Sequence, residues 1–218
     1  MKYFLVFIRF LKKKILYQLP ELIYVNYFLE LNEKNLNPTS DELFNSLNSF
    51  INTLNSLNIK HSISKGTLLG YKRNKNLIKG DIDIDIDIFS NQMIYEILNL
   101  VDMTVYRTMI YKGVYQNIVF FDKRNNCLID LAIFNFDRDK YINVTPHGTF
   151  SLPKKLVFGI NNKNGYYTYN EEYLNNWYGK DWENPRPYFK SWIEHYKEDC
   201  KYFNFSNFVI KKVNFIKK

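Results

Sequence analysis

The segment from Gly80 to Ile88 alternates four aspartates with four isoleucines. A period of two predicts a β-strand, because successive side chains of a strand point to opposite faces of the sheet. Four carboxylates would then share one face at a spacing of roughly 6.5 to 7 Å: Asp81, Asp83, Asp85 and Asp87. Like charges in a row are unfavourable unless a cation neutralises them. The strand is therefore a candidate site for a divalent metal ion.

Two other interpretations of this strand are less favoured. An alternating strand with its polar face turned to water is common in antiparallel sheets, but such faces usually mix polar residue types. This face has only aspartate, in a chain whose net charge is +8. An EF-hand calcium loop is disfavoured, because it needs a glycine at its tight turn and a glutamate at its twelfth position, whereas isoleucines fill the intervening positions here.

A Gly-Thr pair, Gly66-Thr67, lies about fifteen residues before this strand and opens a short apolar run. A glycine lets the backbone approach a ligand closely, and the first N–H groups of a helix can donate to an anion. Alone, the pair is equally typical of an ordinary turn and helix cap. A phosphate-binding turn followed by an Asp-x-Asp strand is, however, the layout of the nucleotidyltransferase superfamily, which this stretch resembles.

More narrowly, the segment from residue 64 to residue 85 resembles the LicD or fukutin-related family. That family's signature runs approximately Ser-Gly-Thr-Leu-Leu-Gly, two residues, Arg, an apolar-Pro-Trp turn and Asp-x-Asp-Ile-Asp. The chain has Gly66-Thr67-Leu68-Leu69-Gly70 and Arg73, then Asp81-Ile82-Asp83-Ile84-Asp85. It departs from the signature at Lys79 and Gly80, where the family has Pro-Trp, and at Ile82, which is often acidic there.

A second block is similar to the family's closing pattern of Tyr-Leu, Tyr-Gly, Asp-Trp and Pro. It runs from Tyr173-Leu174 through Trp177-Tyr178-Gly179 and Asp181-Trp182 to Pro185. Considered without the family, the block predicts the end of an aromatic helix. Gly179 suits a left-handed C-cap, Pro185 prevents the helix from resuming, and the aromatic residues have a packing role.

A single acid, Asp130, interrupts an apolar strand-like run from Cys127 to Phe134. An unpaired carboxylate is costly to bury, so Asp130 needs a cation, a basic partner or an exposed face. The resemblance implies a third carboxylate at this place. Asp83, Asp85 and Asp130 are therefore the predicted metal ligands and catalytic residues, with Asp81 or Asp87 as the rival ligand if the register slips by two.

The resemblance implies in-line attack by an acceptor hydroxyl on a phosphorus atom of an activated donor. The expected cofactor is Mg²⁺, with Mn²⁺ as an alternative, and it would neutralise the phosphate oxygens. Asp85 or Asp130 would take the hydroxyl proton, and the sequence does not choose between them. Gly66, Thr67 and Arg73 are the predicted contacts to the donor's phosphates, although Arg73 could equally be a solvated surface arginine.

The chain has 218 residues and no linker rich in Gly, Ser or Pro, which fits one catalytic domain. We predict an N-terminal helical arm over residues 1–38 and a single domain over 39–218. The basic charge is explained by a Lys-rich, Asn-rich composition, and its clusters form no convincing nucleic-acid stripe. Residues 1–11 are apolar but too short to span a bilayer, so we expect a cytoplasmic protein, with peripheral membrane contact as an open alternative.

The two cysteines, Cys127 and Cys200, lack the CxxC spacing of a metal site and suit a reducing compartment. The three histidines are scattered, so a Cys/His zinc site is not expected. Each histidine is expected to be a surface or core residue rather than a ligand: His61, His147 and His195.

Local patterns predict the elements around the site. Thr39 and Glu42 form a capping box, and an apolar stripe follows it to Leu57 at helical spacing. Helices are also expected over residues 12–33 and 92–100, and strands over 60–63, 81–89, 104–110, 115–121 and 128–134, with a turn at 125–126. Residues 135–169 are ambiguous, apart from turns at 146–148 and 161–162. The expected fold is α+β, a nucleotidyltransferase-like mixed sheet packed by helices.

The leading functional hypothesis is a Mg²⁺-dependent transferase of the LicD type. It would move a phosphorylated group, such as phosphocholine or an alditol phosphate, from a CDP-linked donor to a glycan-type acceptor hydroxyl. Donor and acceptor come from the resemblance. The alternatives are true nucleotidyl transfer to a small molecule, protein or RNA, and a non-enzymatic metal-binding or nucleotide-binding module.

Overall fold

The computed structural model describes residues 22–27, 31–91, 93–146, 148–156, 160–161, 166–185, 203–205 and 210–214. Its helices are η1 (Glu33–Asn35), α2 (Ser40–Ser56), α3 (Lys65–Asn74), α4 (Ile94–Leu100), η2 (Lys154–Leu156) and α5 (Glu171–Tyr178). Its first strands are β1 (Leu22–Asn26), β2 (His61–Ile63), β3 (Asp83–Ile88), β4 (Thr104–Tyr111), β5 (Val114–Asp122) and β6 (Cys127–Ile133). Its later strands are β7 (Asn135–Asp137), β8 (Lys140–Thr145), β9 (Gly148–Pro153), β10 (Ile160–Asn161), β11 (Tyr167–Thr168), β12 (Phe203–Phe205) and β13 (Ile210–Asn214).

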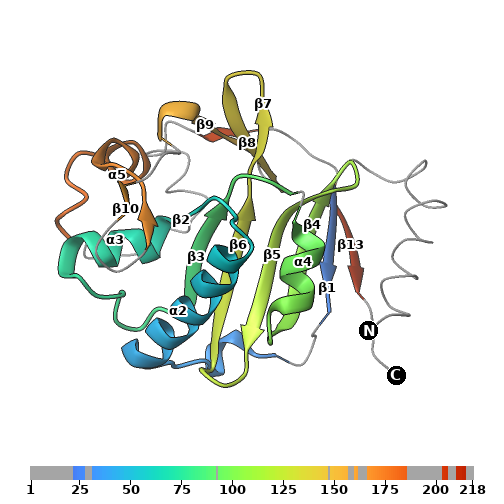
Figure 1. Cartoon of the computed structure of the whole chain (residues 1–218), viewed down its shortest axis with the longest axis horizontal. Helices are drawn as coiled ribbons and strands as arrows, with labels where there is room; N and C mark the ends of the chain where they lie inside the picture. The colour runs from blue at the N-terminus through green and yellow to red at the C-terminus, as the bar shows by residue number, and fades with distance from the viewer. Residues whose placement is uncertain are drawn as a thin grey trace.

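Within these residues the strands form two sheets. The larger has nine strands in the order β10-β11-β2-β3-β6-β5-β4-β1-β13 (Figure 1). At its centre β3 pairs with β6 in parallel, while β2 and β5 flank this pair in antiparallel orientation. This mixed sheet with helices packed on it confirms the predicted α+β class.

The alternation of Asp and Ile in β3 separates the two faces of the sheet. Ile84, Ile86 and Ile88 are fully buried and belong to the main hydrophobic core. They lie on the face of the sheet that helix α2 covers. The apolar stripe of α2 includes Leu47 and Leu54, which are also fully buried. The aspartates of β3 consequently lie on the opposite face.

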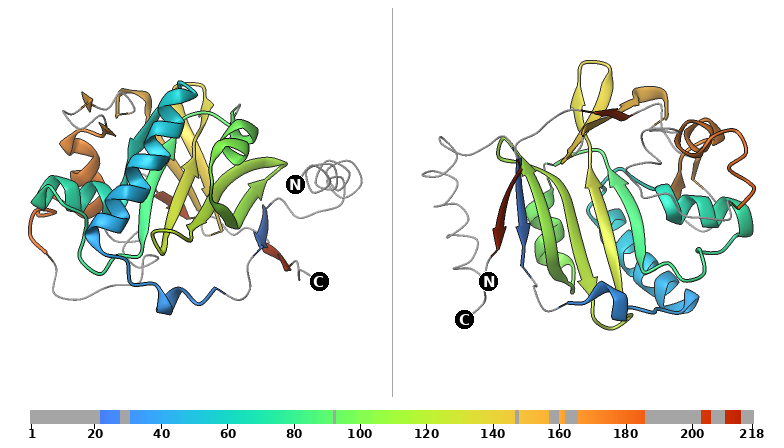
Figure 2. Two further views of the ribbon diagram at one scale, coloured as in Figure 1. Left: turned by 60° about the horizontal axis from the view of Figure 1, so that its bottom comes forward. Right: turned by 180° about the vertical axis from the view of Figure 1, so that it is seen from behind.

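Helices α2 and α4 cover the face of the sheet turned to the viewer in Figure 1, and they lie behind the strands when the molecule is seen from behind (Figure 2, right). Helix α2 begins at the predicted capping box: Glu42 N–H donates to Thr39 Oγ1 at 3.2 Å, and Thr39 N–H donates to the Glu42 carboxylate at 2.7 Å. Helices α3 and α5 lie together near β2 and the edge strands beyond it (Figure 1).

The smaller sheet has the order β12-β9-β8-β7, and its β7–β8 hairpin extends past one end of the main sheet (Figure 1). A buried polar group fixes it to the main sheet. The Asn143 side chain donates to the Gln116 and Ile133 carbonyl oxygens at 2.6 and 2.9 Å, and Val144 N–H donates to Gln116 Oε1 at 2.9 Å. All three hydrogen bonds join β8 to the paired strands β5 and β6.

Most predicted elements are present within one to three residues of their expected ends, but the helix predicted over residues 12–33 is wrong for residues 22–26. These residues form β1, which pairs with β4 and β13. Their β-branched and aromatic side chains favour a strand once neighbouring strands supply hydrogen bonds. Residues 12–21 and 28–30 lie outside the described residues, and the domain boundary at residue 38 stays a prediction.

The ambiguous stretch of residues 135–169 contains most of the smaller sheet. The turn predicted at 146–148 is confirmed at Pro146, which follows β8, whereas Gly148 begins β9 and residue 147 lies outside the described residues. The turn predicted at 161–162 falls partly outside the described residues, and residue 161 ends strand β10. Among the helices that the structure describes, none has the length and apolar character needed to cross a membrane.

Candidate active site

The structure brings together the three carboxylates predicted from the sequence. Asp85 of β3 and Asp130 of β6 are register partners in the parallel pair, and Asp83 lies two residues before Asp85 on the same face. One carboxylate oxygen from each of the three residues lies within 4.8 Å of the other two. We call Asp83, Asp85 and Asp130 the carboxylate cluster.

Asp85 is held by the N-terminus of helix α3. Its Oδ2 accepts a hydrogen bond from Gly66 N–H at 3.0 Å, and its Oδ1 accepts one from Lys65 Nζ at 3.2 Å. Its own backbone N–H donates to Thr67 Oγ1 at 2.8 Å. The positive end of the helix dipole and the ammonium group therefore both stabilise the ionised form of Asp85.

Thr67 has a different contact from the one predicted. Its side chain is 2% exposed, and its hydroxyl oxygen accepts from the Asp85 N–H. A phosphate has almost no surface of Thr67 to contact in this arrangement. The Thr67 hydroxyl fixes the backbone of the metal-ligand candidate Asp85, and its predicted contact to a donor phosphate stays a prediction.

Gly66 lies where two carboxylates approach the helix. A Cβ atom added at this position would lie 3.2 Å from Asp81 Oδ2 and 3.3 Å from Asp85 Oδ2, closer than nearly all real Cβ contacts. The absence of a side chain thus allows the carboxylates to reach the N-terminus of α3. Its N–H is bonded to Asp85, and its predicted contact to a donor phosphate stays a prediction.

Asp130 is oriented by Asn117, a residue that the sequence prediction missed. The Asn117 amide donates both to Asp130 Oδ1 and, at 3.2 Å, to the Leu131 carbonyl oxygen. Asn117 lies on β5 and is 5% exposed. The only sequence signal was a Gln-Asn pair inside an otherwise apolar strand. Such a pair needs buried hydrogen-bond partners, and those partners become visible only once β5 and β6 are aligned.

The two alternative ligands have separate surroundings. Asp87 is 1% exposed and accepts hydrogen bonds from Ser64 Oγ at 2.8 Å and from the Tyr169 hydroxyl at 2.7 Å. Two buried hydroxyls thus hold Asp87 in place, and its role as an alternative metal ligand stays a prediction. Asp81 precedes β3 and hydrogen-bonds the Asp83 side chain, so it lies at the margin of the carboxylate cluster.

Burial and mutual repulsion raise the pKa values of two acids in this region. Burial, with the nearby carboxylates of Asp81 and Asp130, raises the pKa of Asp83 well above its usual range. Burial raises the pKa of Asp85 to about 7 although the Lys65 ammonium opposes the shift. A divalent cation would remove the repulsion and favour the ionised carboxylates.

Arg73 also has a different contact from the one predicted. Its guanidinium donates to the Trp182 carbonyl oxygen, at 2.6 Å from Nε, and to the Asn184 carbonyl oxygen at 3.3 Å. These carbonyls belong to the second sequence block. In this structure Arg73 therefore joins the two blocks that carry the family resemblance, and its predicted contact to a donor phosphate stays a prediction.

Four buried aromatic rings, which we call the aromatic stack, form a wall beside the site. Successive rings lie face to face with centroids 4.0, 5.2 and 4.9 Å apart: Tyr169, Tyr173, Trp177 and Phe150. The Tyr169 hydroxyl donates to Asp87, and the Tyr173 hydroxyl accepts from Lys65 N–H at 3.4 Å. The packing role predicted for the helix aromatics Tyr173 and Trp177 is confirmed by their burial.

The carboxylate cluster fits a hard divalent cation. Mg²⁺ and Mn²⁺ prefer carboxylate oxygen ligands. In octahedral Mg²⁺ neighbouring ligands lie roughly 3 Å and opposite ligands roughly 4.2 Å apart, so oxygens within 4.8 Å of one another would have to draw closer to bind one ion. Neither histidine nor cysteine is part of this group, which disfavours zinc.

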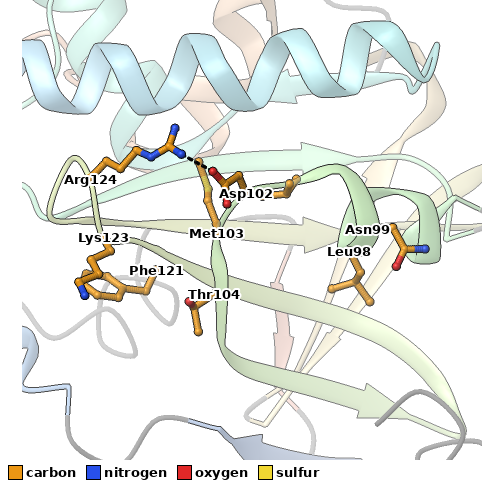
Figure 3. A pocket seen from close by; sticks show the side chains of 9 residues that line it. Leu98, Asn99, Asp102, Met103, Thr104, Phe121, Lys123 and Arg124 are labelled. Carbon is orange, nitrogen blue, oxygen red and sulfur yellow. Dashed lines mark hydrogen bonds and ion pairs between the residues drawn. The ribbon is translucent and has the colours of Figure 1, made fainter. Parts of the chain in front are cut away.

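A separate hollow of about 770 Å³ lies between the end of α4 and the ends of β4 and β5 (Figure 3). Its rim includes an exposed ion pair between Arg124 and Asp102. No residue of the carboxylate cluster lines it. The carboxylate cluster and this hollow therefore lie in different parts of the structure.

No protein-family model matches this chain, and no curated protein matches it either. The likeness to the LicD family thus depends on the two sequence blocks, which the structure brings into contact through Arg73.

Proposed function

We propose that this protein is a Mg²⁺-dependent transferase of the nucleotidyltransferase type, related to the LicD family. It moves a phosphorylated group from a CDP-activated donor to a hydroxyl of a glycan or similar acceptor. The carboxylate cluster carries this proposal, because two strands far apart in the sequence converge on three acids in a ligand-sized space. The donor and acceptor classes come from the family resemblance.

The residues at the carboxylate cluster would have separate roles in such a reaction. When bound, the ion would supply positive charge to the donor's phosphate oxygens and to the leaving nucleotide. Asp83, Asp85 and Asp130 would hold that ion. The N-terminus of α3 points its Gly66 N–H into the same space and adds a positive dipole there.

Asp130 is the better candidate for the general base. Both Asp85 oxygens accept hydrogen bonds, from Lys65 and Gly66, whereas the described hydrogen bond to Asp130 involves only Oδ1. The acceptor hydroxyl would lose its proton to Asp130 as its oxygen forms the new bond to phosphorus. The bond from phosphorus to the cytidine monophosphate oxygen breaks, so the nucleotide leaves as CMP.

Calorimetric binding of a donor panel tests this function. CDP-choline, CDP-ribitol, CDP-glycerol, CTP, ATP and UDP-sugars are each titrated with and without Mg²⁺, using wild type and Asp83→Ala. Mg²⁺-dependent binding of one CDP-linked compound, absent from the variant, supports the proposal. Preference for a nucleoside triphosphate assigns nucleotidyl transfer instead, and absence of any binding contradicts an enzyme of this class.

A further inference from the structure

Lys65 forms the most enclosed of the ion pairs that the structure describes. Its Nζ lies 3.2 Å from Asp85 Oδ1, and the two side chains are 19% and 12% exposed. The Arg124–Asp102 pair, by comparison, has side chains 79% and 81% exposed. An exposed ion pair contributes little to stability, because solvent screens its charges. In an enclosed pair the two charges are screened less and interact more strongly.

The backbone of Lys65 is held in a conformation that a side-chain-bearing residue rarely adopts. Its φ is +40°, in the left-handed region, although it is the first residue of α3. Its N–H donates to the Tyr173 hydroxyl, and the neighbouring Ser64 N–H donates to the Asp85 carbonyl oxygen at 3.0 Å. Strain of this kind persists only where the surrounding contacts fix the residue, and it is concentrated at functional sites.

The ammonium therefore occupies a place that a divalent ion would also need. It contacts an oxygen of Asp85, whose other oxygen is bonded to Gly66. Three carboxylates carry three negative charges when ionised. Before an ion is bound, the ammonium offsets part of that charge, and an incoming divalent ion competes with it for Asp85.

We propose that Lys65 is the resident counter-ion of the carboxylate cluster, which a divalent ion displaces from Asp85 when it binds. Lys65 thereby keeps the acids together before the ion arrives and lowers the affinity for the ion. This inference rests on the proposed function, because it takes the carboxylate cluster as the metal site.

Mn²⁺ titration of the full chain, followed by calorimetry, tests the proposal without measuring turnover. Wild type is expected to bind one Mn²⁺. Lys65→Met is expected to bind it at least tenfold more tightly, while Lys65→Arg retains the charge and stays close to wild type. Lys72→Met removes the same charge from the same helix, where no contact to the carboxylate cluster is described, and is the matched control.

The outcomes separate this inference from the proposed function. Unchanged or weaker Mn²⁺ binding by Lys65→Met, with normal binding by wild type, overturns the role of Lys65 and leaves the metal site standing. Wild-type binding that Asp83→Ala does not reduce overturns both. Should Lys65→Met fail to fold, NMR of the lysine ammonium groups in wild type decides: Mg²⁺ must shift the Lys65 signal, and an unmoved signal overturns the displacement.

Discussion

Asp85 and Asp130 face each other across a parallel strand pair, each held by a different neighbour: Asp85 by the N-terminus of α3, and Asp130 by the amide of Asn117 on β5. Parallel register places both carboxylates at the same height on the same face of the sheet. A shift of one residue in either strand would move one acid into the hydrophobic core beneath α2. The geometry of the site is thus a property of strand register.

Removing any member of the carboxylate cluster is expected to abolish turnover while the fold persists. Asp130→Asn keeps the size of the side chain but removes its charge, so a loss on the order of 10³-fold in turnover is expected. Steady-state kinetics with the identified donor, alongside circular dichroism, measures it. The control is Asp102→Asn, an exposed aspartate at the separate hollow; equal losses in both variants would contradict a catalytic role for Asp130.

Asn117 is expected to act on metal binding through Asp130. In Asn117→Leu the carboxylate loses the donor that orients it, and residues that support metal ligands typically alter affinity by about 10-fold to 100-fold. Mn²⁺ titration measures the loss. Asn99→Leu, at the separate hollow, is the matched control. An Asn117 variant with wild-type Mn²⁺ affinity and reduced thermal stability would show that the amide only supports the sheet.

Replacing Arg73 by Met is expected to lower stability and to leave Mn²⁺ affinity unchanged. The variant deprives the Trp182 and Asn184 carbonyl oxygens of a charged donor, and hydrogen bonds to charged groups contribute about 1.5 to 3 kcal/mol. Urea unfolding of this variant and of Lys72→Met gives the difference. Unaltered stability together with weaker donor binding would support the phosphate contact of Arg73 that was predicted from the sequence.

The metal-free protein is expected to lose stability as the pH rises from about 4 to about 7. The pKa of Asp85 is raised to about 7 in the folded protein, from an ordinary value near 4, so the unfolded chain releases its proton first. Thermal unfolding in a chelator across this range measures the effect. Asp85→Asn should flatten the pH dependence, as should saturating Mg²⁺; a wild-type curve that matches the variant's would argue against the raised pKa.

His61 is expected to produce the opposite dependence on pH. It is 2% exposed, its Nδ1 lies 2.8 Å from the Ile59 carbonyl oxygen, and its Nε2 has no hydrogen-bond partner among the described residues. Burial lowers the pKa of His61 below its usual value near 6.5. Stability attributable to this residue is present above pH 6.5 and is lost as the pH falls, because the unfolded chain binds the proton more readily.

The comparison of wild type with His61→Phe isolates this contribution. The difference in unfolding free energy between the two proteins should change between pH 7 and pH 5, with wild type losing the more stability. Calorimetric melting at several pH values measures it. A constant difference over this range would mean that His61 titrates equally in both states.

The sequence was most informative where local patterns decide the structure. The period of two in β3 and the capping box at Thr39 depend on a few neighbouring residues, and both are confirmed. Gly179 does cap α5 and has a positive φ of +89°, but its ψ of 168° lies outside the left-handed helical region that was predicted. Asp130 could be singled out because an acid inside an apolar strand demands a partner. Its proximity to Asp85 is confirmed, while the catalytic roles of both stay predictions.

What the sequence missed depends on contacts between distant segments. Strand β1 had been predicted as helix because its pairing with β4 and β13 is not encoded in its own periodicity. Asn117 and Lys65 acquire their roles only from the carboxylates placed opposite them. The phosphate contact of Arg73 was predicted from the family resemblance. Its partners in the structure, the main-chain carbonyls of Trp182 and Asn184, leave no signal in the sequence.

The parallel pairing of β3 and β6 also determines when the site can form during folding. A hairpin made of β4 and β5 lies between them in the sequence, and the aromatic stack comes still later in the chain. Pairings between distant segments form slowly, because loop-closure entropy opposes them. A nascent chain therefore presents the acidic face of β3 before Asp130 and Tyr173 have been synthesised. The three acids of the proposed metal site can therefore come together only late in biogenesis.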